Sequence, residues 1–272
     1  MTIVDAVVTV IQARMGSTRL PGKVLLPLGG KPALARMLER VQSAALSGTV
    51  VVATTILPED DAIEALCIEE RVSCFRGDPT DLLDRHVQAA RRFGAAHVVK
   101  IPSDCPLIDP EVIDRVIGTY LAGQGCWDYV SNLHPPSWPD GNDVEIMSRK
   151  ALEIAWTEAS FPFEREHTTP FLWDQPDRFR IGNVFWDEGP DLSMLVRLTL
   201  DWQADYELIR MIFESAYPAN PCFGLREVLQ LFQVWPDLGR INAHLRGINW
   251  YRHHLDQLRT VSPAETRQPG SP

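Results

Sequence analysis

The chain has 272 residues, is 45% hydrophobic and 23% charged, and carries a formal net charge of −10. Its length suits one α/β domain with an appendage, and its acidity argues against a nucleic-acid surface, which needs a basic stripe to neutralise phosphates. No apolar run is long enough to span a bilayer and the N-terminus lacks a signal-peptide pattern, so we expect a cytoplasmic protein without a membrane partner. The first forty residues hold six Lys or Arg residues and two acidic ones, which predicts a local site for an anionic small molecule.

Strand-like and helix-like segments alternate through the first half of the chain. Apolar β-branched runs predict strands at residues 6–12, 49–55, 72–75, 97–101 and 128–131. Apolar residues at helical spacing predict helices at residues 32–46, 58–70, 80–93 and 110–121. This alternation predicts an α/β fold with a mostly parallel central sheet flanked by helices. Ligands of such sheets bind beyond the carboxyl ends of the strands.

The second half is less regular. A loop rich in Pro, Trp and His at residues 132–141 is expected at the edge of a pocket. Further strands are expected at residues 143–147, 179–185 and 194–200, and helices at residues 151–160, 164–173, 204–216, 225–234 and 236–245. From residue 262 onward the chain is polar and rich in proline, which predicts disorder.

A glycine-rich basic loop follows the first strand. Residues 12–23 read Gln-Ala-Arg-Met-Gly-Ser-Thr-Arg-Leu-Pro-Gly-Lys. Gly16 and Gly22 allow backbone amides to converge on phosphate oxygens, although their spacing is neither the Walker pattern nor the dinucleotide fingerprint. Arginine forks and a lysine ammonium bind phosphate well. We therefore predict that this loop binds phosphate through Arg14, Arg19 and Lys23, in preference to the interpretation that its charges are only solvated.

Residues 11–25, which contain this loop, resemble the signature of the cytidylyltransferases that make CMP-activated sugar acids, such as the acylneuraminate and 3-deoxy-manno-octulosonate enzymes. The resemblance is closest to the branch of spore coat polysaccharide biosynthesis proteins of the SpsF type, and it covers roughly residues 3–215. The other matching segments, in the family's order and spacing, are 51–61 (VVATTILPEDD), 75–85 (FRGDPTDLLDR), 103–109 (SDCPLID), 139–145 (PDGNDVE), 164–170 (EREHTTP) and 200–207 (LDWQADYE).

The resemblance implies a Rossmann-like, GT-A-like nucleotide-diphospho-sugar transferase fold. Residues 1–217 would form the nucleotidyltransferase domain, with the acceptor side and a dimer contact in 132–200, followed by a helical extension at 218–261 and a disordered tail at 262–272. The implied enzyme joins CMP from CTP to a sugar acid or sugar phosphate and releases pyrophosphate. It would use Mg²⁺, form a homodimer and serve surface polysaccharide or glycoconjugate synthesis.

The same resemblance implies the site residues. Lys23, Arg14 and Arg19 would be catalytic, and Asp104 and Asp201 would bind the metal, since Mg²⁺ needs only one or two carboxylates. Asp104 also follows the strand at 97–101, which places it at the same sheet edge as the basic loop. The nucleotide-binding residues would be Gln12, Ala13, Arg14, Gly16, Ser17, Thr18, Arg19, Lys23, Thr54, Asp81 and Arg85. The acceptor-binding residues would be Asp140, Asp143, Glu145, Glu166 and His167.

Several of these residues also have structural interpretations. Asp201 could cap the helix that begins near residue 204, Asp81 could cap a helix, and Arg85 could form a surface ion pair. His167 could be a structural hydrogen bonder. The chain departs from the family pattern on both sides of the metal site: Ser103 stands where relatives often have Gly, and Trp202-Gln203 where many have Thr-Pro.

Three other functions stay open on the residues alone. A glycosyltransferase with a similar sheet usually holds its metal with Asp-x-Asp, whereas residues 103–105 (Ser-Asp-Cys) contain one Asp. Transfer of a uridylyl, thymidylyl or guanylyl group is a second alternative, and a non-catalytic relative is a third. The acceptor could be a nonulosonic or octulosonic acid, a phosphorylated sugar or a phosphonate-type acid.

Overall fold

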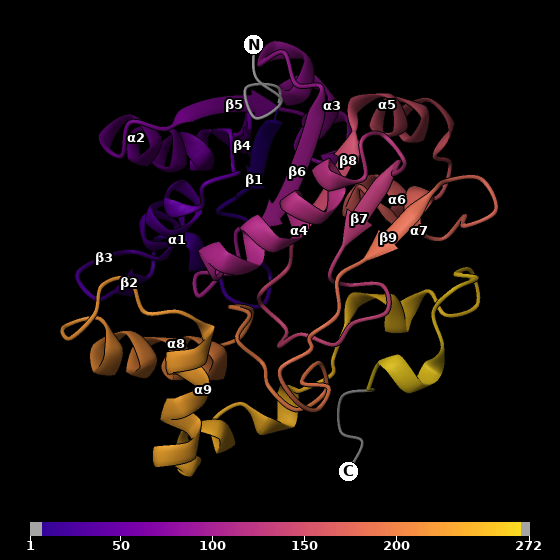
Figure 1. The fold of residues 1–272 in the computed structure, drawn as a ribbon. Coiled ribbons are helices and arrows are strands. Elements are labelled where there is room, and N and C mark those ends of the chain that lie inside the picture. Colours follow the sequence, from indigo (N-terminus) through magenta and orange to yellow (C-terminus); the bar gives the residue numbers. More distant parts are fainter. Residues whose placement is uncertain (1–6, 268–272) are drawn as a thin grey trace.

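A computed structural model describes residues 7–267 (Figure 1). Seven strands form one sheet in the order β5-β4-β1-β6-β8-β7-β9; β8 runs antiparallel to its neighbours β6 and β7, and the other neighbouring pairs are parallel. This confirms the predicted α/β class and mostly parallel sheet. The strands of this sheet are β1 (Val7–Gln12), β4 (Thr49–Thr55), β5 (Ser73–Gly77), β6 (His97–Pro102), β7 (Tyr129–Ser131), β8 (Glu145–Ser148) and β9 (Ile181–Asn183). A separate short pair is β2 (Pro27–Leu28) with β3 (Lys31–Pro32).

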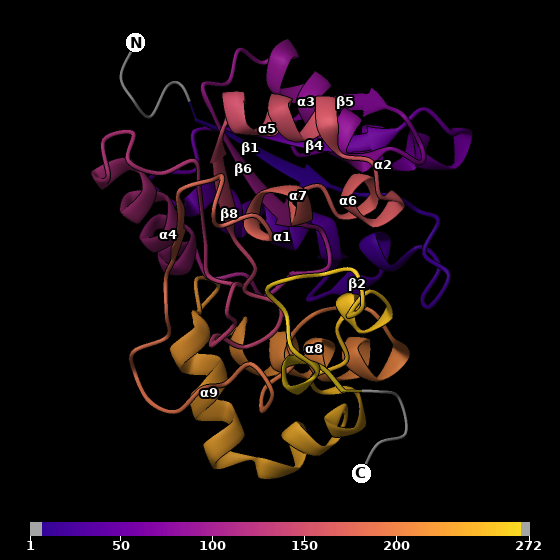
Figure 2. The ribbon, with the colours of Figure 1, turned by 90° about the vertical axis from the view of Figure 1, so that its right-hand side faces the viewer.

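Helices cover both faces of the sheet because successive strand residues point to opposite sides (Figures 1 and 2). Val7 and Ile11 of β1 belong to a core with α1, α2 and α4, whereas Val8 and Val10 belong to a second core with α3, α5, α6 and α7. The helices are α1 (Ala33–Ser43), α2 (Asp61–Glu69), α3 (Leu82–Arg92), α4 (Pro110–Ala122), α5 (Arg149–Glu158), α6 (Pro162–His167), α7 (Pro170–Trp173), α8 (Gln203–Ala216) and α9 (Leu225–Val234). None of the helices described in this part of the chain has the length and apolarity that a bilayer crossing requires.

The C-terminal part, from the start of α8 to residue 267, lies beyond the edge of the sheet at which the parallel strands end (Figures 1 and 2). Phe223 and Val228 belong to the same core as α1 and α4, and Tyr251 belongs to the core under α3. The expected boundary at residue 217 stays a prediction. Of the tail expected to be disordered, residues 262–267 contain a short 3-10 helix and a buried Thr266, and residues 268–272 lie outside the described residues. The 3-10 helices of this part are η4 (Pro236–Arg240), η5 (Ala243–Leu245), η6 (Trp250–His253) and η7 (Pro263–Glu265).

Three elements differ from the sequence expectation. The helix expected at 164–173 is two helices, because Thr168 takes a φ of +74° and Pro170 has no N–H to continue the helical ladder. The helix expected at 236–245 is two 3-10 turns with Gly239 inside the first. The strand expected at 194–200 is not part of the sheet: it begins in a turn at residues 193–195 and then makes a single bridge between Arg197 and Asp140.

His86 of α3 makes stability depend on pH. Burial lowers its pKa to about 3, although its Nδ1 lies 2.9 Å from the carbonyl oxygen of Leu82. An unfolded histidine titrates near 6.5, so as pH falls below that value the unfolded chain binds a proton that the folded chain does not. The stabilisation is complete above pH 6.5 and is lost as pH falls toward about 3.

Protonation of this histidine in the unfolded chain should by itself make the free energy of unfolding about 1.4 kcal/mol smaller at pH 5.5 than at alkaline pH. Urea titrations at several pH values would show a flatter pH dependence for His86→Gln than for the wild type. His244→Gln is the matched control, because His244 is exposed. Equal pH slopes for the wild type and His86→Gln would contradict the prediction.

Candidate active site

The basic loop after β1 is closed on itself. The carbonyl oxygen of Met15 accepts hydrogen bonds from the amides of Ser17 (2.8 Å) and Gly22 (3.0 Å). Gly22 has a φ of +68°, a left-handed conformation that favours glycine. The 3-10 helix η2 (Lys23–Leu25) begins directly afterwards, so the turn at Gly22 sets the position of the lysine.

Asp60, at the end of η3 (Pro58–Asp60), anchors this loop to β4. Its fully buried carboxylate accepts hydrogen bonds from the amide of Met15 (2.7 Å), the amide of Thr55 (3.3 Å) and the hydroxyl of Thr55. The sequence pattern did not single out Asp60, because an acid at the start of a helix is expected from the helix dipole alone. The loop conformation therefore depends on one buried carboxylate, that of Asp60.

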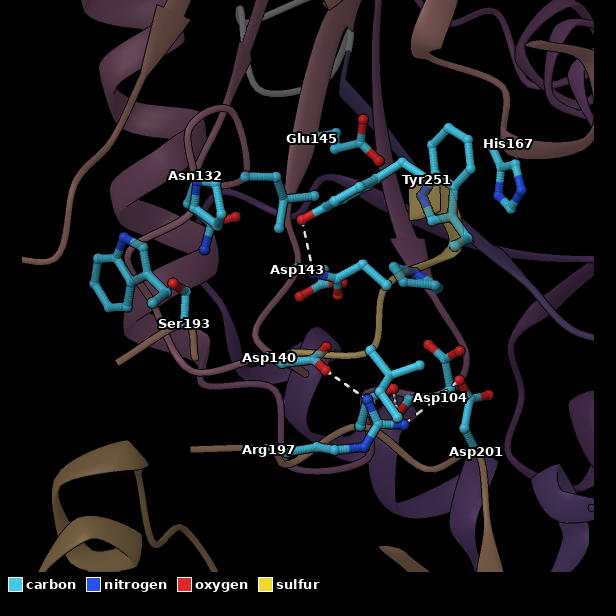
Figure 3. Close-up of a pocket in the computed structure, with 18 of the residues that line it drawn as sticks. Asp104, Asn132, Asp140, Asp143, Glu145, His167, Ser193, Arg197, Asp201 and Tyr251 are labelled. Carbon is cyan, nitrogen blue, oxygen red and sulfur yellow. Dashed lines mark hydrogen bonds and ion pairs between the residues drawn. The ribbon is translucent and has the colours of Figure 1, made fainter. Parts of the chain in front are cut away.

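Lys23 lies between two carboxylates at the carboxyl end of the parallel strands. Its Nζ is 2.6 Å from Asp201 Oδ1 and 3.3 Å from Asp104 Oδ2, and Arg19 Nη2 is 2.8 Å from Asp201 Oδ2. Burial alone would lower the pKa of Lys23, but Asp104 and Asp201 outweigh it and hold that pKa above its usual value. Burial alone would raise the pKa of Asp201, but the charges of Lys23 and Arg19 outweigh it and hold that pKa below its usual value. Lys23 and Asp201 are thus charged at neutral pH. Figure 3 shows Asp104 beside Asp201.

Backbone contacts bring these two aspartates together from distant parts of the sequence. Asp104 follows β6, and its carbonyl oxygen accepts a hydrogen bond from the amide of Leu200 (2.7 Å). Asp201 comes next, and its side chain is used by Lys23 and Arg19 instead of capping α8. Asp205 takes the capping role, since its carboxylate accepts from the amides of Asp201 (3.1 Å) and Trp202 (3.0 Å). The capping interpretation of Asp201 is therefore wrong in this structure.

A network of buried ion pairs lies next to Asp201 and supports its position. Arg197, which is 3% exposed, lies 3.0 Å from Asp205 Oδ1 and 2.8 Å from Asp140 Oδ2. Asn242 of the C-terminal part donates to Asp205 Oδ1 (2.8 Å) and to the carbonyl oxygen of Arg197 (3.0 Å). Burial raises the pKa of Asp140 to about 6, although Arg197 acts to lower it. The sequence pattern did not point to Arg197, because it falls inside the segment 194–200, where a strand was expected.

A cavity of about 250 Å³ opens beside this charged centre (Figure 3). Two stacked pairs form part of its wall: the rings of His167 and Trp250 are 3.7 Å apart, and those of His134 and Trp173 are 4.0 Å apart. Burial lowers the pKa of His167 to about 3 and that of His134 to about 4, so both rings are neutral at pH 7. Parallel, uncharged rings of this kind are suited to contact with the apolar face of a ligand.

Four of the five side chains predicted to bind the acceptor line this cavity, namely Asp140, Asp143, Glu145 and His167. Glu166 is exposed on α6 and does not line it. Glu145 is buried and accepts hydrogen bonds from Lys100 and from the hydroxyl of Tyr129, the latter at 2.7 Å. Burial raises the pKa of Glu145, but Lys100 outweighs it and holds that pKa below the usual value. The family motifs gave no signal for Lys100, which lies inside a strand.

The segment 132–138 contributes to the same cavity. Asn132, His134 and Trp138 line it, and the buried indole of Trp138 donates to the carbonyl oxygen of Val184 (2.7 Å). The predicted place of this loop at a pocket edge is confirmed. Its side chains face the cavity and the core of their own chain, which leaves few of them for the dimer contact also expected of this segment.

Buried polar atoms without a hydrogen-bond partner occur, among the described residues, at the end of β1, in β4 and in α3. Within residues 7–267, buried Gln12 Oε1, Thr54 Oγ1, Arg85 Nε and Arg85 Nη1 have no hydrogen-bond partner. Burial and the nearby charge of Arg14 lower the pKa of Arg85 to about 10. The surface ion pair considered for Arg85 is wrong, because this side chain is buried and none of the described acidic groups pairs with it. Buried polar groups are normally satisfied, so these atoms point to a ligand.

The other residues predicted to bind the nucleotide differ in their contacts and in their exposure to solvent. Asp81 caps α3 through the amide of Asp84 (2.8 Å) and bonds Arg165 Nε (2.6 Å), so both of its oxygens have partners. Ala13 is buried and pairs with β4 through its amide. The side of the loop that faces solvent consists of Arg14, Gly16, Thr18 and Arg19, with Ser17 half-buried.

A sequence model described as Cytidylyltransferase matches residues 8–228. The chain belongs to the cytidylyltransferase family. It is therefore a nucleotidyltransferase, and the resemblance that began at residues 11–25 is confirmed. The spore coat polysaccharide biosynthesis protein SpsF of Bacillus subtilis is 32% identical over 235 residues, which are 84% of this chain and 94% of that protein.

Two further relatives support this membership. The 3-deoxy-manno-octulosonate cytidylyltransferase of Polynucleobacter asymbioticus is 33% identical over 168 residues, which are 58% of this chain and 63% of that enzyme. The solved structure of a cytidylyltransferase from Leptospira borgpetersenii superposes with a TM-score of 0.81 at 33% identity and covers 86% of this chain and 96% of its own. This cytidylyltransferase thus shares both sequence and fold with the family.

Proposed function

We propose that this enzyme transfers CMP from CTP to an acidic or phosphorylated sugar and releases pyrophosphate. The observation that carries the proposal is the convergence of Lys23 and Arg19 with Asp104 and Asp201 beside a glycine-rich loop. The relatives' names, one for spore coat polysaccharide biosynthesis and one for 3-deoxy-manno-octulosonate, support an acceptor used in surface polysaccharides.

The nucleotide would bind along the loop between β1 and η2. Gln12 Oε1, Thr54 Oγ1 and the Nε and Nη1 of Arg85 are buried without a partner in residues 7–267, and they would bind the base and ribose. Arg14, Arg19 and the loop amides would hold the β- and γ-phosphates. A hydroxyl oxygen of the acceptor then attacks the α-phosphorus and gives up its proton to water. The bond from that phosphorus to the bridging oxygen breaks, and pyrophosphate leaves in line. Such transfers depend on positioning and charge stabilisation, which the cations of this loop supply.

The donor set beside Lys23 fits Mg²⁺. In the part of the chain that the structure describes, no three His, Cys, Asp or Glu side chains form a ready metal cluster. Mg²⁺ commonly takes one or two carboxylates and completes its shell with phosphate oxygens and water. Asp104 and Asp201 would hold it, and when bound it offsets charge on the phosphates.

Calorimetric titration with CTP, UTP, GTP, ATP and CMP-sugars, with and without Mg²⁺, tests the proposal. We expect Mg²⁺-dependent binding that is selective for CTP. Tighter binding of a finished CMP-sugar would favour a glycosyltransferase, and preference for another triphosphate would change the transferred group. No nucleotide binding at all would favour a non-catalytic relative.

Asp60→Asn is expected to weaken CTP binding about tenfold, which corresponds to roughly 1.4 kcal/mol. The free energy of unfolding should fall by about 1–3 kcal/mol, because the amide presents a donor where the amides of Met15 and Thr55 need acceptors. Calorimetry and urea titration measure the two effects. Asp61→Asn is the matched control, since Asp61 is exposed and pairs with Arg76; an equal loss in both variants would contradict the anchoring role.

We also propose a homodimer, as the family resemblance implies. Exposed Val234 and Trp235, at the end of α9, support a contact through the C-terminal helices more than one through segment 132–138. Sedimentation velocity of the wild type and of Val234→Lys tests this contact, and a monomeric wild type would contradict it.

A further inference from the structure

One part of the cavity wall comes from the C-terminal segment 248–252. All five of its residues line the cavity, and the segment lies beyond residues 8–228 that the family model matches. In the view of Figure 3, Tyr251 reaches between Glu145 and Asp143. This chain therefore completes its acceptor cavity with residues that the family signature does not contain.

The segment is held in place by the last residues that the structure describes. The amide of Asn249 donates to Thr266 Oγ1 (3.2 Å), and Asn249 Nδ2 donates to the hydroxyl of Tyr251 (2.6 Å). That hydroxyl donates in turn to the carbonyl oxygen of Glu265 (2.8 Å). Trp250 stacks on His167 at the same time. A wall fixed in this way loses little freedom when a ligand binds.

Arg252 differs from the other cations that line the cavity. Arg19 pairs with Asp201, Lys100 with Glu145, and Arg197 with Asp140 and Asp205. For Arg252, none of the described carboxylates lies within ion-pairing distance. Its Nη1 donates to the carbonyl oxygen of Asn249 (2.7 Å), and its buried Nε has no partner within residues 7–267.

The surroundings of Arg252 favour an added anion. Arg19, Arg197 and Arg252 all line this cavity. Burial and the charges of Arg19 and Arg197 lower the pKa of Arg252, and they outweigh Asp201, which acts to raise it. Asp201, the acid whose charge acts on Arg252, is already paired with Arg19 and Lys23. A ligand carboxylate or phosphate would relieve the repulsion and satisfy the guanidinium with charge-assisted hydrogen bonds.

We propose that Arg252 binds the carboxylate or phosphate group of the acceptor, so that the C-terminal segment selects an anionic sugar. This inference rests on the proposed function, to which it adds the residue that binds the anionic group of the acceptor. The cavity is lined by the four acceptor-side residues Asp140, Asp143, Glu145 and His167, and of the proposed nucleotide residues only by Gln12 and Arg19, so we place Arg252 on the acceptor side of the site. Arg252 is thus a specificity-determining residue.

The test uses the full-length enzyme saturated with α,β-methylene-CTP and Mg²⁺, so that the phosphate loop is filled. Calorimetry then measures the binding of 3-deoxy-manno-octulosonate, N-acetylneuraminate, mannose 6-phosphate and uncharged mannose. We expect at least one anionic sugar to bind, and Arg252→Gln to weaken it about 10- to 100-fold, the usual effect of losing a hydrogen bond to a charged group. Affinity for the CTP analogue should stay within about twofold. The sugar acids and the sugar phosphate distinguish a carboxylate from a phosphate.

Arg240→Gln is the matched control: it removes the same charge from the C-terminal part at an exposed arginine that pairs with Asp237. It should bind the analogue and the sugar like the wild type. Unchanged sugar affinity in Arg252→Gln, binding of mannose alone, or no binding of any anionic sugar would overturn the proposal. If Arg252→Gln lost affinity for the CTP analogue, Arg252 would be a nucleotide-binding residue, and this result would also overturn the proposal. Failure of the wild type to bind the analogue contradicts the proposed function itself, and with it this inference.

Discussion

Lys23→Ala is expected to lower kcat for CMP transfer by about 10²–10³-fold, the usual cost of removing one preorganised charge contact. The Lys23 ammonium contacts both Asp104 and Asp201, and its side chain is only 12% exposed. In the proposed reaction, its loss would remove the positive charge that offsets the charge developing on pyrophosphate. Steady-state assays of pyrophosphate release measure the effect, with circular dichroism to check that the variant is folded.

A second readout separates this role from a structural one. Without Lys23, the carboxylates of Asp104 and Asp201 repel each other, so the free protein should bind Mn²⁺ more tightly, as followed by electron paramagnetic resonance. Lys31→Ala is the control, because Lys31 is 40% exposed and pairs with Glu39 and Glu70. It should match the wild type in both assays. Near-normal turnover in Lys23→Ala would show that Lys23 does not stabilise the leaving pyrophosphate.

Asp104→Asn should lose turnover on the same scale of about 10²–10³-fold. The carbonyl oxygen of Asp104, which accepts from the amide of Leu200, is unchanged by the substitution, so the backbone pairing that positions Asp201 should survive. The loss can then be assigned to the missing carboxylate. The measurement is kcat against Mg²⁺ concentration, together with Mn²⁺ binding in the presence of α,β-methylene-CTP.

The control for Asp104→Asn is Asp237→Asn, which changes an exposed aspartate that pairs with Arg240. We expect it to keep the wild-type metal dependence. If Asp104→Asn kept a wild-type kcat and Mn²⁺ affinity, Asp104 would not be a metal ligand and the donor set would have to be sought elsewhere.

The sequence by itself determined the α/β class, the sheet and the glycine-rich basic loop after the first strand. These depend on local signals: β-branched runs bury themselves as strands, and glycines between cations shape a loop at a strand end. The strand at 49–55 and the helix at 225–234 have the bounds predicted from these signals. Lys23 and Asp104 were also predictable, because each follows a strand whose carboxyl end lies at one edge of the sheet.

Only the tertiary structure decided which polar groups meet. Asp201 had two interpretations of equal local merit, and the choice came from Leu200 pairing with Asp104 while Asp205 took over the cap. The partners of Arg197 and the place of Arg252 are likewise set by contacts between segments far apart in the chain. Local patterns carry no information about such pairs, because long-range packing and the burial of charge select them.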